Sequence, residues 1–185
     1  MKGDFSRDTF DPEKHYSRVL MQQGRVQLDS DWNEAGSISV HYLRSLASDL
    51  IGSHGGPGGS FRITPIAAGA RRPLADLGIG PGHYYVTGLL CENRADDVTY
   101  HSQQDYPVTQ ATETLPPPPF LVYLDVWERH ITVVEDDNTR EPALGGPDTC
   151  TRAQVVWQIK VLPLRATRFR ATGKKLIRSW RERAE

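Results

Sequence analysis

The chain has 185 residues, a formal net charge of −1, 38% hydrophobic residues and four tryptophans. This length suits one domain with extensions, and the apolar fraction is high enough for a packed core, which excludes a disordered chain. The 13 prolines and 16 glycines predict many loops. Two cysteines are too few for a disulfide framework, and no CxxC metal spacing is present.

The charge is distributed unevenly along the chain. Residues 163–185 contain eight Lys or Arg and two Glu, so this tail carries +6 and the remaining residues carry −7. The start, MKGDFSRDTF, lacks the apolar core of a secretory signal peptide, and no stretch approaches the about 18 apolar residues of a membrane span. We therefore predict a cytoplasmic protein with an acidic body, a basic tail and no membrane span.

The first predicted elements are short. Asp11 and Pro12 suit the cap and first turn of a helix running towards Met21, where Gly24 would break it. Apolar and polar residues then alternate over residues 25–29, which predicts a short, half-buried extended run.

A long helix is the strongest local prediction. Asp31 and Glu34 have capping-box spacing, and Asp29 or Ser30 are alternative caps. Gly52 and the following GGPGG end the helix. We expect Trp32 to staple the helix start to a sheet. Residues at steps of three and four form one apolar stripe, which predicts packing on that sheet: Ala35, Ile38, Ser39, Tyr42, Leu43, Leu46 and Leu50.

The rest of the chain has the signature of short strands separated by loops. Residues 69–82 are predicted to be loop, and residues 131–135 are predicted to form a hairpin with the strand before them. The run FLVYLDVW is apolar on nearly every position, which predicts a strand covered on both faces. The predicted strands are 61–66, 83–93 (a pair or one kinked strand around Gly88), 98–101, 120–128, 131–135 and 154–162.

These elements predict an α+β, mainly β fold: a small antiparallel sandwich or barrel-like sheet, with one long N-terminal helix packed on it and extended terminal arms. The predicted segments are an N-terminal arm with two helices (1–60), a β-rich domain (61–162) and a basic tail (163–185).

No catalytic or metal-binding pattern stands out. The six histidines lack HExxH or HxH spacing, and the run after Val134 lacks the spacing of a calcium loop. Cys91 lies in an apolar strand, which favours a core residue over a nucleophile. Asp125 and Glu128 are a carboxylate pair of the type that glycoside hydrolases use, although such pairs are common on structural strands. We predict a protein that is not an enzyme and has no cofactor and no metal.

A family resemblance covers most of residues 1–162. The opening MKGDFSRDTFDPEKHYSRVLMQQGRVQLDSDWNE resembles an uncharacterised bacterial family encoded beside baseplate and tail genes of phage-tail-like contractile injection systems. Further matches are GPGHYYVTGLLCEN, FLVYLDVWERHITVVED and EPALGGPDTCTRAQVVWQIKVL. The resemblance implies a structural subunit of such a particle, in the baseplate, as a cap or adaptor, or associated with a fibre. It implies no catalytic residues.

Both ends of the chain carry aromatic residues that suit assembly. We predict contacts through Phe5 and Phe10 in the N-terminal arm, and through Arg178, Trp180 and Arg181 in the tail. The predicted partners are other copies of the chain, as a trimer or hexamer, and other tail or baseplate proteins. Nucleic acid is not favoured, because the tail contains no recognised nucleic-acid-binding module.

Two other functions remain open at this point. An adhesive, carbohydrate-binding fibre module would expose a cluster of Tyr84, Tyr85 and Tyr106. A carbohydrate-active enzyme would place Asp125 and Glu128 in one pocket.

Overall fold

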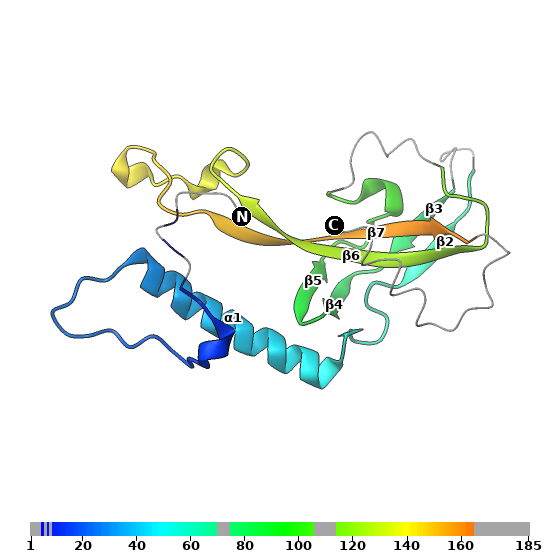
Figure 1. The fold of residues 1–185 in the computed structure, drawn as a ribbon. Helices are drawn as coiled ribbons and strands as arrows, with labels where there is room; N and C mark the ends of the chain where they lie inside the picture. The colour runs from blue at the N-terminus through cyan, green and yellow to red at the C-terminus, as the bar shows by residue number, and fades with distance from the viewer. Residues whose placement is uncertain (1–4, 6, 8, 70–74, 106–113, 165–185) are drawn as a thin grey trace.

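The computed structural model describes residues 5, 7, 9–69, 75–105 and 114–164. Within these residues one α-helix, α1 (Asp29–Ile51), precedes seven strands, as Figure 1 shows. The strands of this described part form three antiparallel sheets and no closed barrel. The predicted fold class, mainly β with one N-terminal helix, is therefore confirmed.

The first sheet has the strand order β1–β4–β5, with β1 (His54–Gly55) at its edge. β4 (Gly82–Val86) and β5 (Leu89–Asn93) form a hairpin whose turn contains Thr87 and Gly88. The alternative of a strand pair around Gly88 is therefore confirmed.

The second sheet pairs β2 (Ile63–Ile66) with β3 (Asp76–Ile79). The prediction of a loop over residues 69–82 is wrong, because β3 lies there and is largely buried. Residues 98–101, predicted as a strand, instead form one bridge from Thr99 to Gly78, followed by a 3₁₀ turn at Tyr100–Ser102.

The third sheet is a long ribbon of β6 (Phe120–Ile131) and β7 (Arg152–Pro163). β6 continues through the predicted turn at residues 128–130 and pairs with β7 over its whole length, so the predicted hairpin with residues 131–135 is wrong. The next residues form turns instead, where Asp136 caps a 3₁₀ turn at Asp137–Thr139 and Glu141 caps another at Pro142–Leu144.

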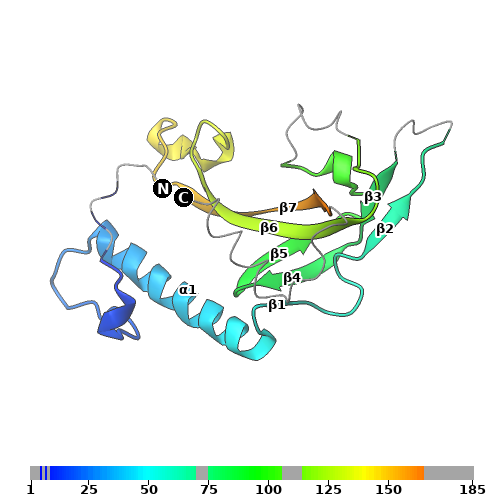
Figure 2. The ribbon, with the colours of Figure 1, turned by 45° about the vertical axis from the view of Figure 1, so that its right-hand side comes forward.

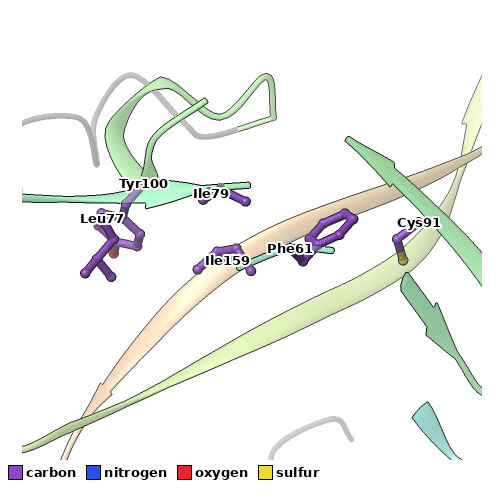
Figure 3. Packing of buried hydrophobic residues seen from close by; sticks show 6 residues of the cluster. All are labelled: Phe61, Leu77, Ile79, Cys91, Tyr100 and Ile159. Atoms are coloured by element: carbon purple, nitrogen blue, oxygen red, sulfur yellow. The ribbon is translucent and has the colours of Figure 1, made fainter. Parts of the chain in front are cut away.

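The core lies between the ribbon and the two small sheets. Its buried members come from all three sheets, the segment before β2 and the turn after Thr99, and Figure 3 shows how they gather: Phe61, Leu77, Ile79, Cys91, Tyr100 and Ile159. Cys91 is fully buried, as predicted, and both cysteines are free. Burial raises the pKa of the Cys91 thiol to about 11, because the apolar core disfavours the thiolate.

The helix lies below the ribbon and contacts the body at a few points (Figure 2). Its C-terminal end approaches β1, its centre approaches the β4–β5 turn, and Arg44 pairs with Glu128 of β6 at 2.5 Å. The N-cap is Leu28, whose N–H donates to the Asp31 carboxylate at 3.1 Å, so the predicted box of Asp31 and Glu34 does not form. Glu34 accepts instead from the Thr9 hydroxyl at 2.5 Å.

Candidate interaction surface

Large apolar side chains are exposed along α1. Ile38 is the one residue of the predicted stripe that is buried, whereas Trp32 is 63% exposed and does not staple the helix to a sheet. Leu43 is 67% exposed, and Leu46 and Leu50 are exposed beside it. The predicted packing of the stripe on the sheet is therefore wrong for most of its members.

The exposed residues follow a regular spacing on the helix. Positions 32, 36, 39, 43, 46 and 50 recur at alternating steps of four and three, which is the heptad spacing of helix-on-helix packing. They carry Trp, Gly, Ser and then three leucines, with no charged side chain among them. This set is called the heptad stripe below: Trp32, Gly36, Ser39, Leu43, Leu46 and Leu50.

The segment before the helix is also exposed. Only Pro12–Lys14 form a 3₁₀ turn, capped by Asp11, and the chain leaves it at His15 in a left-handed conformation (φ 53°). The predicted helix towards Met21 is therefore wrong, and the cap at Asp11 is right. Residues 16–28 form no helix or strand and run as the loop in blue beside α1 in Figure 1. This segment is called the arm below and is distinct from the N-terminal arm that carries Phe5 and Phe10.

The arm carries apolar side chains that face solvent. Val26 is 85% exposed, so the predicted half-buried run over residues 25–29 is wrong. Tyr16, Leu20, Met21 and Leu28 are also exposed. Five exposed apolar side chains within 13 residues make this segment a candidate contact site for another molecule.

The two phenylalanines predicted for assembly lie on their own chain. The Phe5 ring is 5.7 Å from that of His130, and the Phe10 ring is 5.6 Å from that of His41 on α1. These contacts place Phe5 against the ribbon and Phe10 against the helix. Their part in assembly stays a prediction, and Arg178, Trp180 and Arg181 lie outside the described residues.

An apolar cavity of about 550 Å³ lies beside β6. It is lined by four consecutive β6 residues, 121–124, and by residues of β1, β2, β4, β7 and the segment before β2. At its rim the His54 Nδ1 and the Tyr84 hydroxyl are 2.9 Å apart. The lining residues are Ser53, His54, Phe61, Ile63, Tyr84, Val86, Leu121, Val122, Tyr123, Leu124 and Ile159. We call this cavity the slot.

The carboxylates considered for catalysis are held in separate ion pairs. Asp125 accepts from Lys160 at 2.6 Å, whereas Glu128 pairs with Arg44. Neither carboxylate lines the slot. A larger hollow of about 720 Å³, lined in part by Glu92, Arg94 and Trp157, does not contain them either.

The tyrosines proposed for an adhesive surface are not gathered in the described part of the chain. Tyr84 and Tyr85 are half-buried neighbours on β4, so their side chains point to opposite faces, and Tyr106 lies outside the described residues. The described residues include no group of three or more His, Cys, Asp or Glu side chains placed to hold a metal ion. Nor does α1 have the length and hydropathy to cross a membrane.

Sequence reasoning found the apolar stripe and the extended run but assigned both to the interior. The heptad spacing and the lack of charge on the stripe fit packing against a helix, and the exposure of its leucines is what distinguishes an external contact from an internal one. Comparison with curated proteins and with solved structures found no match. A family of unknown function, DUF6519, matches residues 1–179, nearly the whole length, and the chain therefore belongs to this family.

Proposed function

We propose that this protein is a structural subunit that acts by assembling with other copies of itself. The observation that carries the proposal is the heptad stripe, because its large apolar residues face solvent on a well-formed helix. Leaving such side chains in water forfeits about 1.5–3 kcal/mol for each one that a partner would bury. A helix with this surface gains stability when a second helix covers it.

The spacing and charge of the stripe favour a copy of the same chain as partner. A repeat of seven residues packs best against a helix with the same repeat. Neither the stripe nor most of its flanks carries charge; Ala35, Val40 and Ala47 are uncharged, so identical faces meet without like-charge repulsion. The proposed assembly is a trimer or hexamer.

The particle that this subunit serves is proposed from the resemblance of its sequence. That resemblance favours a phage-tail-like contractile injection particle, with the subunit in its baseplate, as a cap or adaptor, or beside a fibre. Other tail or baseplate proteins are its further proposed partners. We propose no catalytic role, because the two candidate carboxylates are each neutralised by a basic side chain and do not share a cavity.

The test compares Leu43→Glu with Leu144→Glu by sedimentation velocity. Both leucines are exposed to a similar degree, 67% and 65%, but Leu144 lies in a turn far from α1 in the sequence. Leu43→Glu is expected to dissociate the assembly, and Leu144→Glu is expected to leave it intact. Equal sedimentation of both variants and the unmodified chain would contradict a role for the stripe.

A further inference from the structure

β6 has the sequence of a central strand but the position of an edge strand. Its first seven residues, 120–126, are apolar at all but one position, yet none of them is buried. Strands with continuous apolar runs are ordinarily covered on both faces. The prediction that both faces of this strand are covered is therefore wrong for the part of the chain that the structure describes.

The edge of β6 that faces away from β7 is open in the described part of the chain, where β6 pairs with β7 alone. The direction in which the N–H and C=O groups of β6 point can be inferred from a contact that Gln103 makes with the partner strand, β7. The side-chain amide of Gln103 donates to the carbonyl of Ile159 at 3.0 Å and accepts from its N–H at 2.5 Å, so the backbone of Ile159 points away from β6.

Leu124 lies directly opposite Ile159 in the ribbon. Directly opposed residues of an antiparallel pair both point inward or both point outward, and the direction alternates along each strand. The N–H and C=O groups of Leu124, and by alternation those of Val122, therefore point away from β7. These two residues also line the slot.

The slot is thus lined both by residues at the open edge of β6 and by apolar side chains of other elements. Val122 and Leu124 pack on the core side with Phe61 and Tyr84. An extended segment placed along β6 would pair with its backbone and bury its own apolar side chains in the cavity, which is the geometry of strand addition. A long open edge of this type is a template for pairing with another chain.

The arm has the complementary properties. Arg25 and Gln27 alternate with Val26 and Leu28, which is the pattern of a strand with one apolar face, although no sheet receives it in the described residues. Val26 is 85% exposed, so the folded chain alone leaves this face in water.

The arm cannot reach the slot of its own chain. Val26 is two residues from Leu28, the helix cap, so it lies within about 7 Å of the start of α1. Ser53 and His54 line the slot directly beyond the other end of the helix. The 23 residues of α1 separate the two sites by roughly 35 Å at 1.5 Å per residue.

We infer that the arm of one copy adds a strand to β6 of a second copy and fills its slot. Val26 and Leu28 enter the cavity beside Val122 and Leu124, and Arg25 and Gln27 face outward. The contact joins the arm of each copy to the slot of the next, so it is heterologous and closes into a ring when its rotation allows. This inference rests on the proposed self-assembly and names a second contact that supports it.

The first experiment is a directed cross-link between two chains, both with Cys150→Ser to remove the exposed thiol. One chain carries Val26→Cys and the other carries Val122→Cys, which is half-buried at the slot and lies on the face of β6 that Val26 is inferred to reach. Mild oxidation of the mixture is expected to give a covalent mixed dimer. A control mixture replaces Val26→Cys with Val134→Cys, an equally exposed valine at 88%, and is expected to give none.

The second experiment compares Val26→Asp with Val134→Asp in sedimentation velocity. An aspartate in the apolar slot is expected to weaken association by about tenfold or more, because a buried charge without a partner is strongly disfavoured. Val134→Asp is expected to leave association unchanged. An assembly that forms normally with Val26→Asp and gives no mixed dimer would overturn the arm contact alone, whereas a monomeric unmodified chain would overturn self-assembly as well.

Discussion

The two cysteines differ in exposure and in electrostatic environment. Burial raises the pKa of Cys91 to about 11, whereas the hydrogen bond with Thr149, followed by that with Arg152, lowers the pKa of the exposed Cys150. Because the thiolate is the reactive form, Cys150 is the more reactive of the two thiols in the folded chain.

We predict that iodoacetamide at pH 8 modifies Cys150 within minutes and modifies Cys91 only in denaturant. Mass spectrometry of the peptides with and without urea measures both rates. Comparable labelling of Cys91 in the folded chain would show that the core around it is open.

Asp76 is buried, and its carboxylate lies 3.0 Å from Nδ1 of His101. Burial by itself raises the pKa of Asp76, but hydrogen bonds from Thr99 and the Leu77 N–H, together with the charge of His101, leave it below its ordinary value. A lowered folded-state pKa contributes stability above the unfolded value of about 3.9, and this contribution is lost as the pH falls through the folded-state pKa.

Asp76→Asn is therefore expected to lower the free energy of unfolding at pH 7 by about 1–3 kcal/mol. The deficit relative to the unmodified chain is expected to shrink at pH 3, where the carboxyl group of the unmodified chain takes up protons. Thermal unfolding at both pH values measures it. Asp137→Asn is the control, because Asp137 makes an exposed ion pair with Arg140, and such pairs contribute about 0–1 kcal/mol. A deficit that is the same at both pH values would contradict the linkage.

Between elements, the backbone of the helix lies close to the β4–β5 turn at Gly88. A Cβ at this position would lie 2.3 Å from the carbonyl oxygen of Arg44, and the residue has φ +78°. Glycine is needed here for both reasons, since other residues are strained in this conformation and the helix backbone cannot yield.

Gly88→Ala is expected to cost at least about 2 kcal/mol of stability and to loosen α1 from the sheet. Gly58→Ala is the matched control, because a Cβ added there would meet no atom within 4 Å and its φ lies outside the left-handed region. Urea unfolding measures the free energy, and hydrogen exchange of α1 amides measures the loosening. Equal stability of the two variants would show that the helix shifts freely on the sheet.

Local signals in the sequence predicted the elements that depend on local interactions. The end of α1 at Gly52, the turn at Gly88 and most of β7 follow from residue types and periodicity. The sequence did not predict β3, because Asp and Gly, which occur at positions 76 and 78, are typical of loops. The strand is stabilised by its pairing with β2, which a local pattern does not show. The partner of β6 was missed for a similar reason, since β7 follows only after a long connection.

The candidate interaction surface could be predicted in part. The 3,4 spacing of Leu43, Leu46 and Leu50 is visible in the sequence, but an apolar stripe has the same pattern whether it faces the core or a partner. Only the fold shows that these leucines point away from the body. The same holds for Val26. Its alternation with polar neighbours predicts a strand, but the pattern does not show whether the sheet belongs to the same chain or to another copy.

At the scale of the whole molecule, the exposed parts complement one another. The heptad stripe offers a helix contact, the arm offers a strand, and the slot receives one. The proposed symmetric assembly of identical chains would bring all three into contact at once. Self-assembly is therefore the central claim.

The mass of the full chain in solution, measured by light scattering after size exclusion over a range of concentrations, tests this claim most directly. One chain has a mass of 20.7 kDa. The account predicts a discrete multiple of this mass, three or six copies, that persists on dilution into the low micromolar range. A mass of one chain at every concentration would contradict it.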